Sequence, residues 1–167
     1  MKRYCTIRTP LGDMVALAEG DHLRGLWFTD QKYVPEDAGD RVYDPDHPLF
    51  VELRRQLDAY FAGRLREFNL PLAPEGTPFQ MAVWKLLRTI PRGTTTTYGA
   101  LAIRMAQGRE GRATSARAVG SAVGRNPIDI IIPCHRVVGA DGSLTGYAGG
   151  LDRKAALLSL EKVKVSG

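Results

Sequence analysis

Short apolar runs separated by turn residues fill the first third of the chain. The runs cover residues 4–8, 14–18 and 22–28, and the segments between them, 9–13 and 19–21, contain proline, glycine and aspartate. Apolar runs bounded by such turn residues are typical of β-hairpins. We therefore expect an antiparallel meander of three strands at the start of the chain.

A polar segment and then a helical pattern follow the predicted strands. Residues 30–47 are polar and carry two prolines, which indicates a loop. We expect Asp46 to cap a helix that holds Pro48 in its first turn and ends at Gly63. Its apolar positions keep helical spacing and predict a helix that covers the sheet; they are Phe50, Leu53, Leu57, Tyr60 and Phe61.

A domain boundary is predicted near residue 76. Two prolines and a glycine in residues 70–76 exclude a continuous helix or strand there. The predicted domains are therefore residues 1–76 and 77–167. Thr77, Pro78 and Gln80 form the pattern of a capping box, so a helix is expected to start there and to end before Pro91.

Two further short helices are predicted in the second domain. Thr97 is expected to cap a helix over residues 98–106, and residues 115–124 form the next one. Such a pair suggests a helix-turn-helix. Arg117 is the single long polar side chain of the second helix, too few to read base edges in a major groove. Its small residues allow close approach either to a protein core, where Ala and Gly are common, or to a nucleic-acid groove.

Charge is divided unevenly along the 167 residues. Residues 1–83 carry 10 basic and 13 acidic side chains, a net −3, whereas residues 84–167 carry 13 and 5, a net +8. The positive half favours a polyanionic partner, although a charged surface that serves solubility alone is also compatible. With no apolar run of about 18 residues and no signal-peptide core, we expect a cytoplasmic protein, associated with the nucleoid if it binds DNA.

The most reactive candidate group is Cys134. It follows an apolar run over residues 128–132, predicted to be a buried strand, and lies between Pro133 and His135. Neighbouring basic groups favour a thiolate nucleophile. A buried core thiol and a Cys-His hydrolase are the alternatives. A metal site is disfavoured because no second cysteine lies nearby and the three histidines lack ligand spacing.

Residues 132–138, Ile-Pro-Cys-His-Arg-Val-Val, resemble the active-site motif of the O6-alkylguanine-DNA alkyltransferases, also called methylated-DNA–protein-cysteine methyltransferases. The resemblance is dense over residues 77–161, with further matching motifs at 116–120, 126–127 and 145–150. It implies an α+β fold, in which a ribonuclease-H-like antiparallel sheet with a covering helix precedes a helical domain that bears the helix-turn-helix.

The family resemblance implies direct reversal of DNA damage. The alkyl group of O6-alkylguanine, and also of O4-alkylthymine, would pass stoichiometrically to the thiolate of Cys134 in a single turnover, with no cofactor and no metal. The damaged nucleotide would be flipped out of double-stranded DNA that a monomer binds through the minor groove without sequence specificity. A damage sensor of the same family lacks the cysteine, and a hydrolase would need an oxyanion hole that the sequence does not indicate.

The resemblance also assigns roles around the reacting sulfur. Glu161 would orient His135, and His135 would deprotonate Cys134 through a water molecule. Asn126 would tie the turn beneath the cysteine. Tyr98 would donate a hydrogen bond to a ring nitrogen of the leaving guanine.

Substrate contacts follow from the same resemblance. The main-chain carbonyls of Cys134 and Val137 would select the exocyclic amine of guanine, and the amide of Ala148 would contact O6. Tyr147 would form a wall of the pocket, and Lys154 would lie near the cysteine.

DNA contacts are expected from the second helix of the pair. Arg117 would fill the space left in the base stack, beside small residues that contact the groove, namely Ser115, Ala116 and Ala118. The loop over residues 107–114 is longer than the compact turn usual in the family. Its arginines would reach phosphates, or the loop is a passive spacer.

Overall fold

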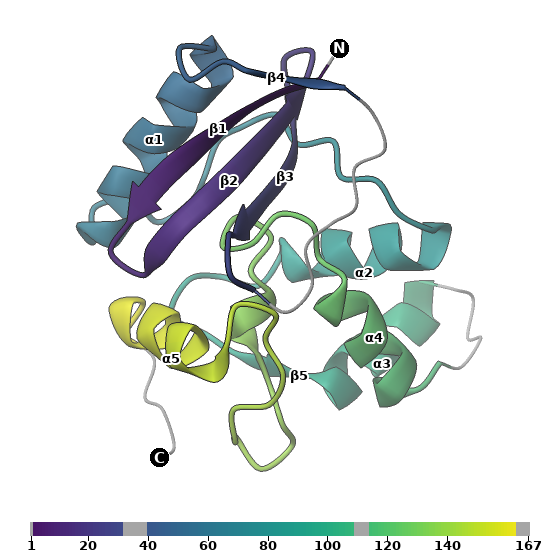
Figure 1. Cartoon of the computed structure of the whole chain (residues 1–167). Coiled ribbons are helices and arrows are strands. Elements are labelled where there is room, and N and C mark those ends of the chain that lie inside the picture. Colours follow the sequence, from purple (N-terminus) through teal and green to yellow (C-terminus); the bar gives the residue numbers. More distant parts are fainter. Residues whose placement is uncertain (1, 32–39, 109–113, 163–167) are drawn as a thin grey trace. The chain divides into compact units, whose positions relative to one another are not determined.

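The computed structural model describes residues 2–31, 40–108 and 114–162 (Figure 1). It divides into two compact units, Met1–Glu75 with Pro127–Asp129, and Gly76–Asn126 with Ile130–Gly167. The centre of the long predicted loop, residues 109–113, lies outside the described residues. Within the described ranges no helix has the length and apolar character required to cross a membrane.

The first unit contains a four-stranded sheet. Strands β1 (Lys2–Thr9), β2 (Gly12–Glu19) and β3 (His22–Phe28) pair as the predicted antiparallel meander. Strand β4 (Arg41–Tyr43) pairs in parallel with β1 and completes the order β3-β2-β1-β4. The prediction of a loop throughout residues 30–47 is therefore wrong. All three residues of β4 are exposed at the sheet edge, so no buried apolar position marked the strand.

Helix α1 (Pro48–Phe61) packs against β1 and covers one face of the sheet (Figure 1). The predicted cap Asp46 is wrong: His47 is the N-cap, and its Nδ1 accepts a hydrogen bond from the amide of Leu49 at 3.1 Å. Because Pro48 occupies the first helical position, the residue immediately before it is the cap. The buried face of the helix matches the predicted spacing and comprises Leu49, Phe50, Leu53, Gln56, Leu57 and Tyr60.

A short segment from late in the sequence pairs with the outer edge of β3. The amide of Leu26 donates to the carbonyl of Pro127 at 2.9 Å, and the amide of Asp129 donates to the carbonyl of Leu26 at 2.8 Å. The strand predicted over residues 128–132 is therefore limited to a single bridge at Ile128. The chain then turns at Ile130, which has a φ of 71°. The run is apolar because it is buried, and not because it forms a strand.

The described part of the second unit contains the α-helices α2 (Pro78–Leu87), α3 (Tyr98–Gly108), α4 (Ala116–Gly124) and α5 (Leu151–Leu160). The capping box at the start of α2 is confirmed, and α2 ends at Leu87, three residues earlier than expected. The indole Nε1 of Trp84 in α2 donates to the carbonyl of Ala122 in α4 at 2.8 Å. Helices α2, α3 and α4 pack together around Val83, Leu87, Leu101, Val119, Ala122 and Val123.

Two very short strands position the region around the cysteine. Strand β5 (Thr96–Thr97) pairs in parallel with β6 (Val137–Val138), which directly follows the 3₁₀ helix η1 (Cys134–Arg136). Because α3 begins immediately after β5, this pairing places Tyr98 near the segment that follows the cysteine. Helix α5, which the sequence pattern did not predict, packs against η1.

Candidate functional site

Cys134 begins the 3₁₀ helix and is 6% exposed. Pro133, with φ −81° and ψ 64°, forms an inverse γ-turn that directs the amide of Cys134 to the carbonyl of Ile132 at 2.8 Å. The same carbonyl accepts a hydrogen bond from Nδ2 of buried Asn126 at 2.7 Å. Asn126 therefore helps to fix the turn that leads into Cys134.

His135 and Glu161 are in direct contact and fully enclosed. Nε2 of the imidazole lies 2.8 Å from Oε2 of the carboxylate, and both side chains are 0% exposed. Nδ1 of His135 is also buried and has no hydrogen-bond partner among the described residues. Burial holds the pKa of His135 below its usual value, and the hydrogen bond and charge of Glu161 only partly oppose this effect. A neutral imidazole is a suitable base for a neighbouring thiol.

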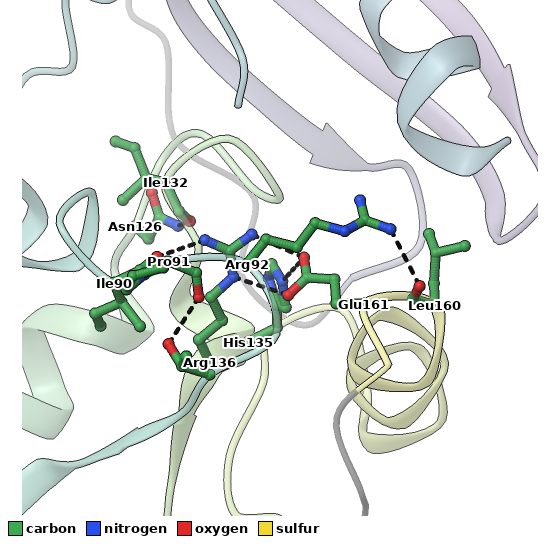
Figure 2. A network of polar contacts seen from close by, with 10 residues as sticks. Ile90, Pro91, Arg92, Asn126, Ile132, His135, Arg136, Leu160 and Glu161 are labelled. Carbon is green, nitrogen blue, oxygen red and sulfur yellow. Dashed lines mark hydrogen bonds and ion pairs between the residues drawn. The ribbon is translucent and has the colours of Figure 1, made fainter. Parts of the chain in front are cut away.

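Arg136 completes this cluster, and the sequence interpretation did not include it among the functional residues. Its Nε donates to Oε1 of Glu161 at 2.8 Å and its Nη2 donates to Oε2 at 2.9 Å (Figure 2). Nη1 donates to the carbonyl of Ile90 at 2.6 Å. The sequence offered one indication of this role, because Arg136 directly follows His135 in the motif. An arginine that is buried there requires a buried acid as its partner.

Lys154 of α5 is fully buried and binds the backbone on both sides of a loop. Its Nζ donates to the carbonyls of Val137, Thr145 and Gly146 at 2.5, 2.7 and 3.2 Å. Burial lowers the pKa of Lys154 to about 8, partly opposed by attraction to Cys134. Lys154, which is predicted to lie near the cysteine, therefore positions the carbonyl of Val137, which is predicted to contact the substrate.

Tyr98 approaches the same loop from the start of α3. Its hydroxyl donates to the carbonyl of Thr145 at 3.2 Å. Its ring lies against Gly120 of α4, where a Cβ would be 3.5 Å from the ring. Burial raises the pKa of Tyr98, so the phenol remains protonated and is a hydrogen-bond donor. Tyr147 and Ala148, the other predicted pocket residues, are half-buried in the same loop.

Helix α4 has a core face and an exposed N-terminal face. Ser115 caps the helix by accepting a hydrogen bond from the amide of Ala118 at 3.0 Å. Ser115, Ala116 and Arg117 are exposed and Ala118 is half-buried. The later turns of the helix pack in the core, which is one of the two interpretations that its small residues left open, and its first turn is exposed.

Cys5 differs from Cys134 in place and surroundings. It lies in β1 of the first unit, and burial raises the pKa of its thiol to about 11 despite the nearby charge of Arg54. Both cysteines are free thiols. Among the described residues, no group of three or more His, Cys, Asp or Glu side chains is arranged to hold a metal ion.

Comparison with known proteins assigns both halves of the chain to one family. Residues 2–74 match the family description "6-O-methylguanine DNA methyltransferase, ribonuclease-like domain". Residues 78–163 match "6-O-methylguanine DNA methyltransferase, DNA binding domain". The α+β class expected from the sequence is confirmed.

Individual relatives are similar to this chain over nearly its full length. The methylated-DNA–protein-cysteine methyltransferases of Mycobacterium tuberculosis and Methanosarcina barkeri are 48% and 47% identical, over 97% and 95% of this chain and 93% and 96% of theirs. The crystal structure of Mycobacterium tuberculosis OGT in complex with DNA is 46% identical with a TM-score of 0.85, covering 96% of this chain and 92% of that one. The chain belongs to the 6-O-methylguanine DNA methyltransferase family.

Proposed function

We propose that this protein repairs alkylated DNA by direct reversal, and that Cys134 accepts the alkyl group from O6 of guanine in a single turnover. The buried hydrogen bond between Glu161 and His135, the residue that follows the cysteine in the chain, is the observation that carries the assignment. The relatives named for transfer from methylated DNA to cysteine support it across the chain. The same displacement on O4-alkylthymine is part of the proposal.

The reaction is a displacement at the alkyl carbon. The bond from Sγ to carbon forms as the bond from carbon to O6 breaks, and the electron pair of the broken bond stays on guanine. The thiol proton passes through a water molecule to His135 and from there to solvent, and a ring nitrogen of the leaving guanine takes up one proton through the Tyr98 hydroxyl. The whole reaction therefore moves one proton from sulfur to the base. Because a thioether is not cleaved by thiols, each molecule reacts once.

The groups around the sulfur suit the flipped base. The Tyr98 hydroxyl, which now donates to Thr145, would exchange this acceptor for a ring nitrogen of guanine. The Val137 carbonyl binds Lys154, and its second lone pair is available to the exocyclic amine. The remaining expected contacts are those of the Cys134 carbonyl with the amine, the Ala148 amide with O6, and the Tyr147 ring with the base.

Helix α4 is the proposed DNA-contacting element. Its exposed first turn offers small side chains to the minor groove and Arg117 to the space left by the flipped base. This mode of binding requires no base readout, which agrees with the lack of long polar side chains on the helix. The duplex substrate would place the working protein at the nucleoid.

A pair of cysteine variants tests the proposal. Cys134→Ala should abolish removal of the methyl group from a duplex with one O6-methylguanine, while duplex affinity stays near wild type because α4 is unchanged. Cys5→Ser is the matched control and should repair at the wild-type rate. Measurable methyl transfer by Cys134→Ala would contradict the assignment.

A further inference from the structure

The carboxylate of Glu161 makes hydrogen bonds with two buried side chains in a closed environment. Arg136 donates to both of its oxygens, at 2.8 and 2.9 Å, and His135 Nε2 lies 2.8 Å from Oε2 (Figure 2). Counted as whole residues, backbone included, Arg136 is 8% exposed and Glu161 is 2% exposed. Arg136 forms an ion pair with this carboxylate, whereas Lys154 donates to three backbone carbonyls.

These contacts determine the direction of the hydrogen bond between His135 and Glu161. An ionised carboxylate only accepts hydrogen bonds, whereas a protonated one can donate. Arginine stays charged, and its two N–H groups on the two oxygens favour the ionised form. Nε2 of His135 must then donate, and in a neutral imidazole the lone pair lies on Nδ1.

We propose that Arg136 is a positioning residue of the alkyl transfer, which keeps Glu161 ionised and thereby fixes the proton of neutral His135 on Nε2, leaving Nδ1 to accept the proton of the Cys134 thiol. The inference rests on the proposed function for the identity of the reaction. Nδ1 is buried and has no partner among the described residues, as an acceptor held ready for a proton would be.

Loss of the guanidinium would take two hydrogen-bond donors and a positive charge from a buried carboxyl group that contacts His135. The pair would then adopt one of two states. In one, the carboxyl is protonated and donates to Nε2, which moves the imidazole proton to Nδ1. In the other, His135 takes a second proton and becomes imidazolium. Both states remove the lone pair of Nδ1.

The charges that face His135 support the neutral form. Glu161 is the anion that attracts a proton to the ring, whereas Arg136 and Lys154 are cations that oppose it. Burial lowers the pKa of His135, and the charges of Arg136 and Lys154 lower it further. Removal of the Arg136 charge should therefore raise the pKa of His135.

Nitrogen NMR of protein labelled with ¹⁵N-histidine measures the tautomer directly. The chain has three histidines, and loss of a signal in His135→Gln assigns the one of interest. In the wild type at neutral pH, we expect a protonated Nε2 and a bare Nδ1. A protonated Nδ1 in the wild type would overturn the proposal, whatever the variants of Arg136 show.

Variants of Arg136 then test its role. Arg136→Met should shift His135 to imidazolium or to the Nδ1–H tautomer, move the acidic limb of the pH-rate profile to higher pH, and slow transfer by about 10- to 100-fold. Arg136→Lys, which keeps the charge, should restore the wild-type tautomer and most of the pH profile. Failure of the lysine variant, once folded, to restore the tautomer would contradict the proposal.

Arg92 provides a matched control. Its Nη2 donates to the carbonyl of Leu160 at 3.2 Å, immediately before Glu161, so it binds the same end of α5 through the backbone (Figure 2). Arg92→Met should leave the His135 tautomer unchanged, and the same change in Arg92→Met as in Arg136→Met would overturn the specific role. If the wild type instead fails to accept a methyl group, the proposed function fails while the tautomer result stands.

Discussion

At the scale of single residues, the site depends on keeping ionisable groups in defined protonation states. Burial lowers the pKa of His135 and that of Lys154, and raises the pKa of Tyr98. A neutral base and a protonated phenol are the forms that the displacement needs. These states follow from desolvation together with specific partners, and desolvation is the larger influence in each case.

The lowered pKa of His135 predicts the pH dependence of alkyl transfer. The base is active when neutral, so the single-turnover rate should stay nearly constant from about pH 8 down to about 6.5, the usual histidine pKa, and fall only at lower pH. Transfer from free O6-benzylguanine, measured across this range, avoids effects of pH on DNA binding. An acidic limb with its midpoint above the usual histidine pKa would contradict the account.

At the scale of secondary-structure elements, α4 is proposed to contact the DNA, whereas the alkyl transfer takes place at Cys134, outside this helix. Arg117→Ala should slow repair in duplex DNA much more than transfer from free O6-benzylguanine, because only the duplex must lose base stacking, at a cost of a few kcal/mol. Single-turnover rates on the two substrates provide the comparison. Equal losses on both substrates would indicate a defect in folding instead.

The packing of α2 on α4 can be tested independently of DNA. Trp84→Phe removes the indole donor to the Ala122 carbonyl and should lower the free energy of unfolding by about 1–3 kcal/mol. Denaturant unfolding measures this loss. Trp27→Phe in β3 is a control in the first unit, because the hydrogen bond between α2 and α4 remains intact. Unchanged stability in Trp84→Phe would show that the hydrogen bond contributes little.

Elements with strong local patterns were predictable from sequence, and elements fixed by distant contacts were not. The meander, the capping box at Thr77 and the short helix after Ser115 follow from nearby residues alone. Strand β4 exists because β1 has a free edge, and Ile128 forms a bridge because β3 has one. No pattern within either segment encodes such a partner.

The candidate site shows the same distinction. Cys134 and His135 were identified from their motif, and Glu161, Asn126, Tyr98 and Lys154 from resemblance to the family. The contact of Arg136 with Glu161 joins residues 25 positions apart, and only the fold shows which acid the buried arginine meets. Sequence reasoning could propose the roles of these residues, whereas their geometry required the structure.

At the scale of the whole molecule, the reaction should change stability. Cys134 is buried in a turn held by Asn126 and by the contacts of Lys154, so an added methyl group must displace packed neighbours. Overpacking costs about 1–3 kcal/mol. The methylated protein should therefore melt at a lower temperature than the unmodified protein in differential scanning calorimetry. An equal or higher melting temperature would contradict this packing argument.

The fate of the methyl group tests the central claim most directly. The wild-type protein is incubated with an excess of duplex that contains one O6-methylguanine, and the mass of the intact protein and of its peptides is then measured. The account predicts a gain of one methyl group per molecule, located on Cys134, and the appearance of unmodified guanine in the duplex. A protein of unchanged mass, or a methyl group on another residue, would contradict it.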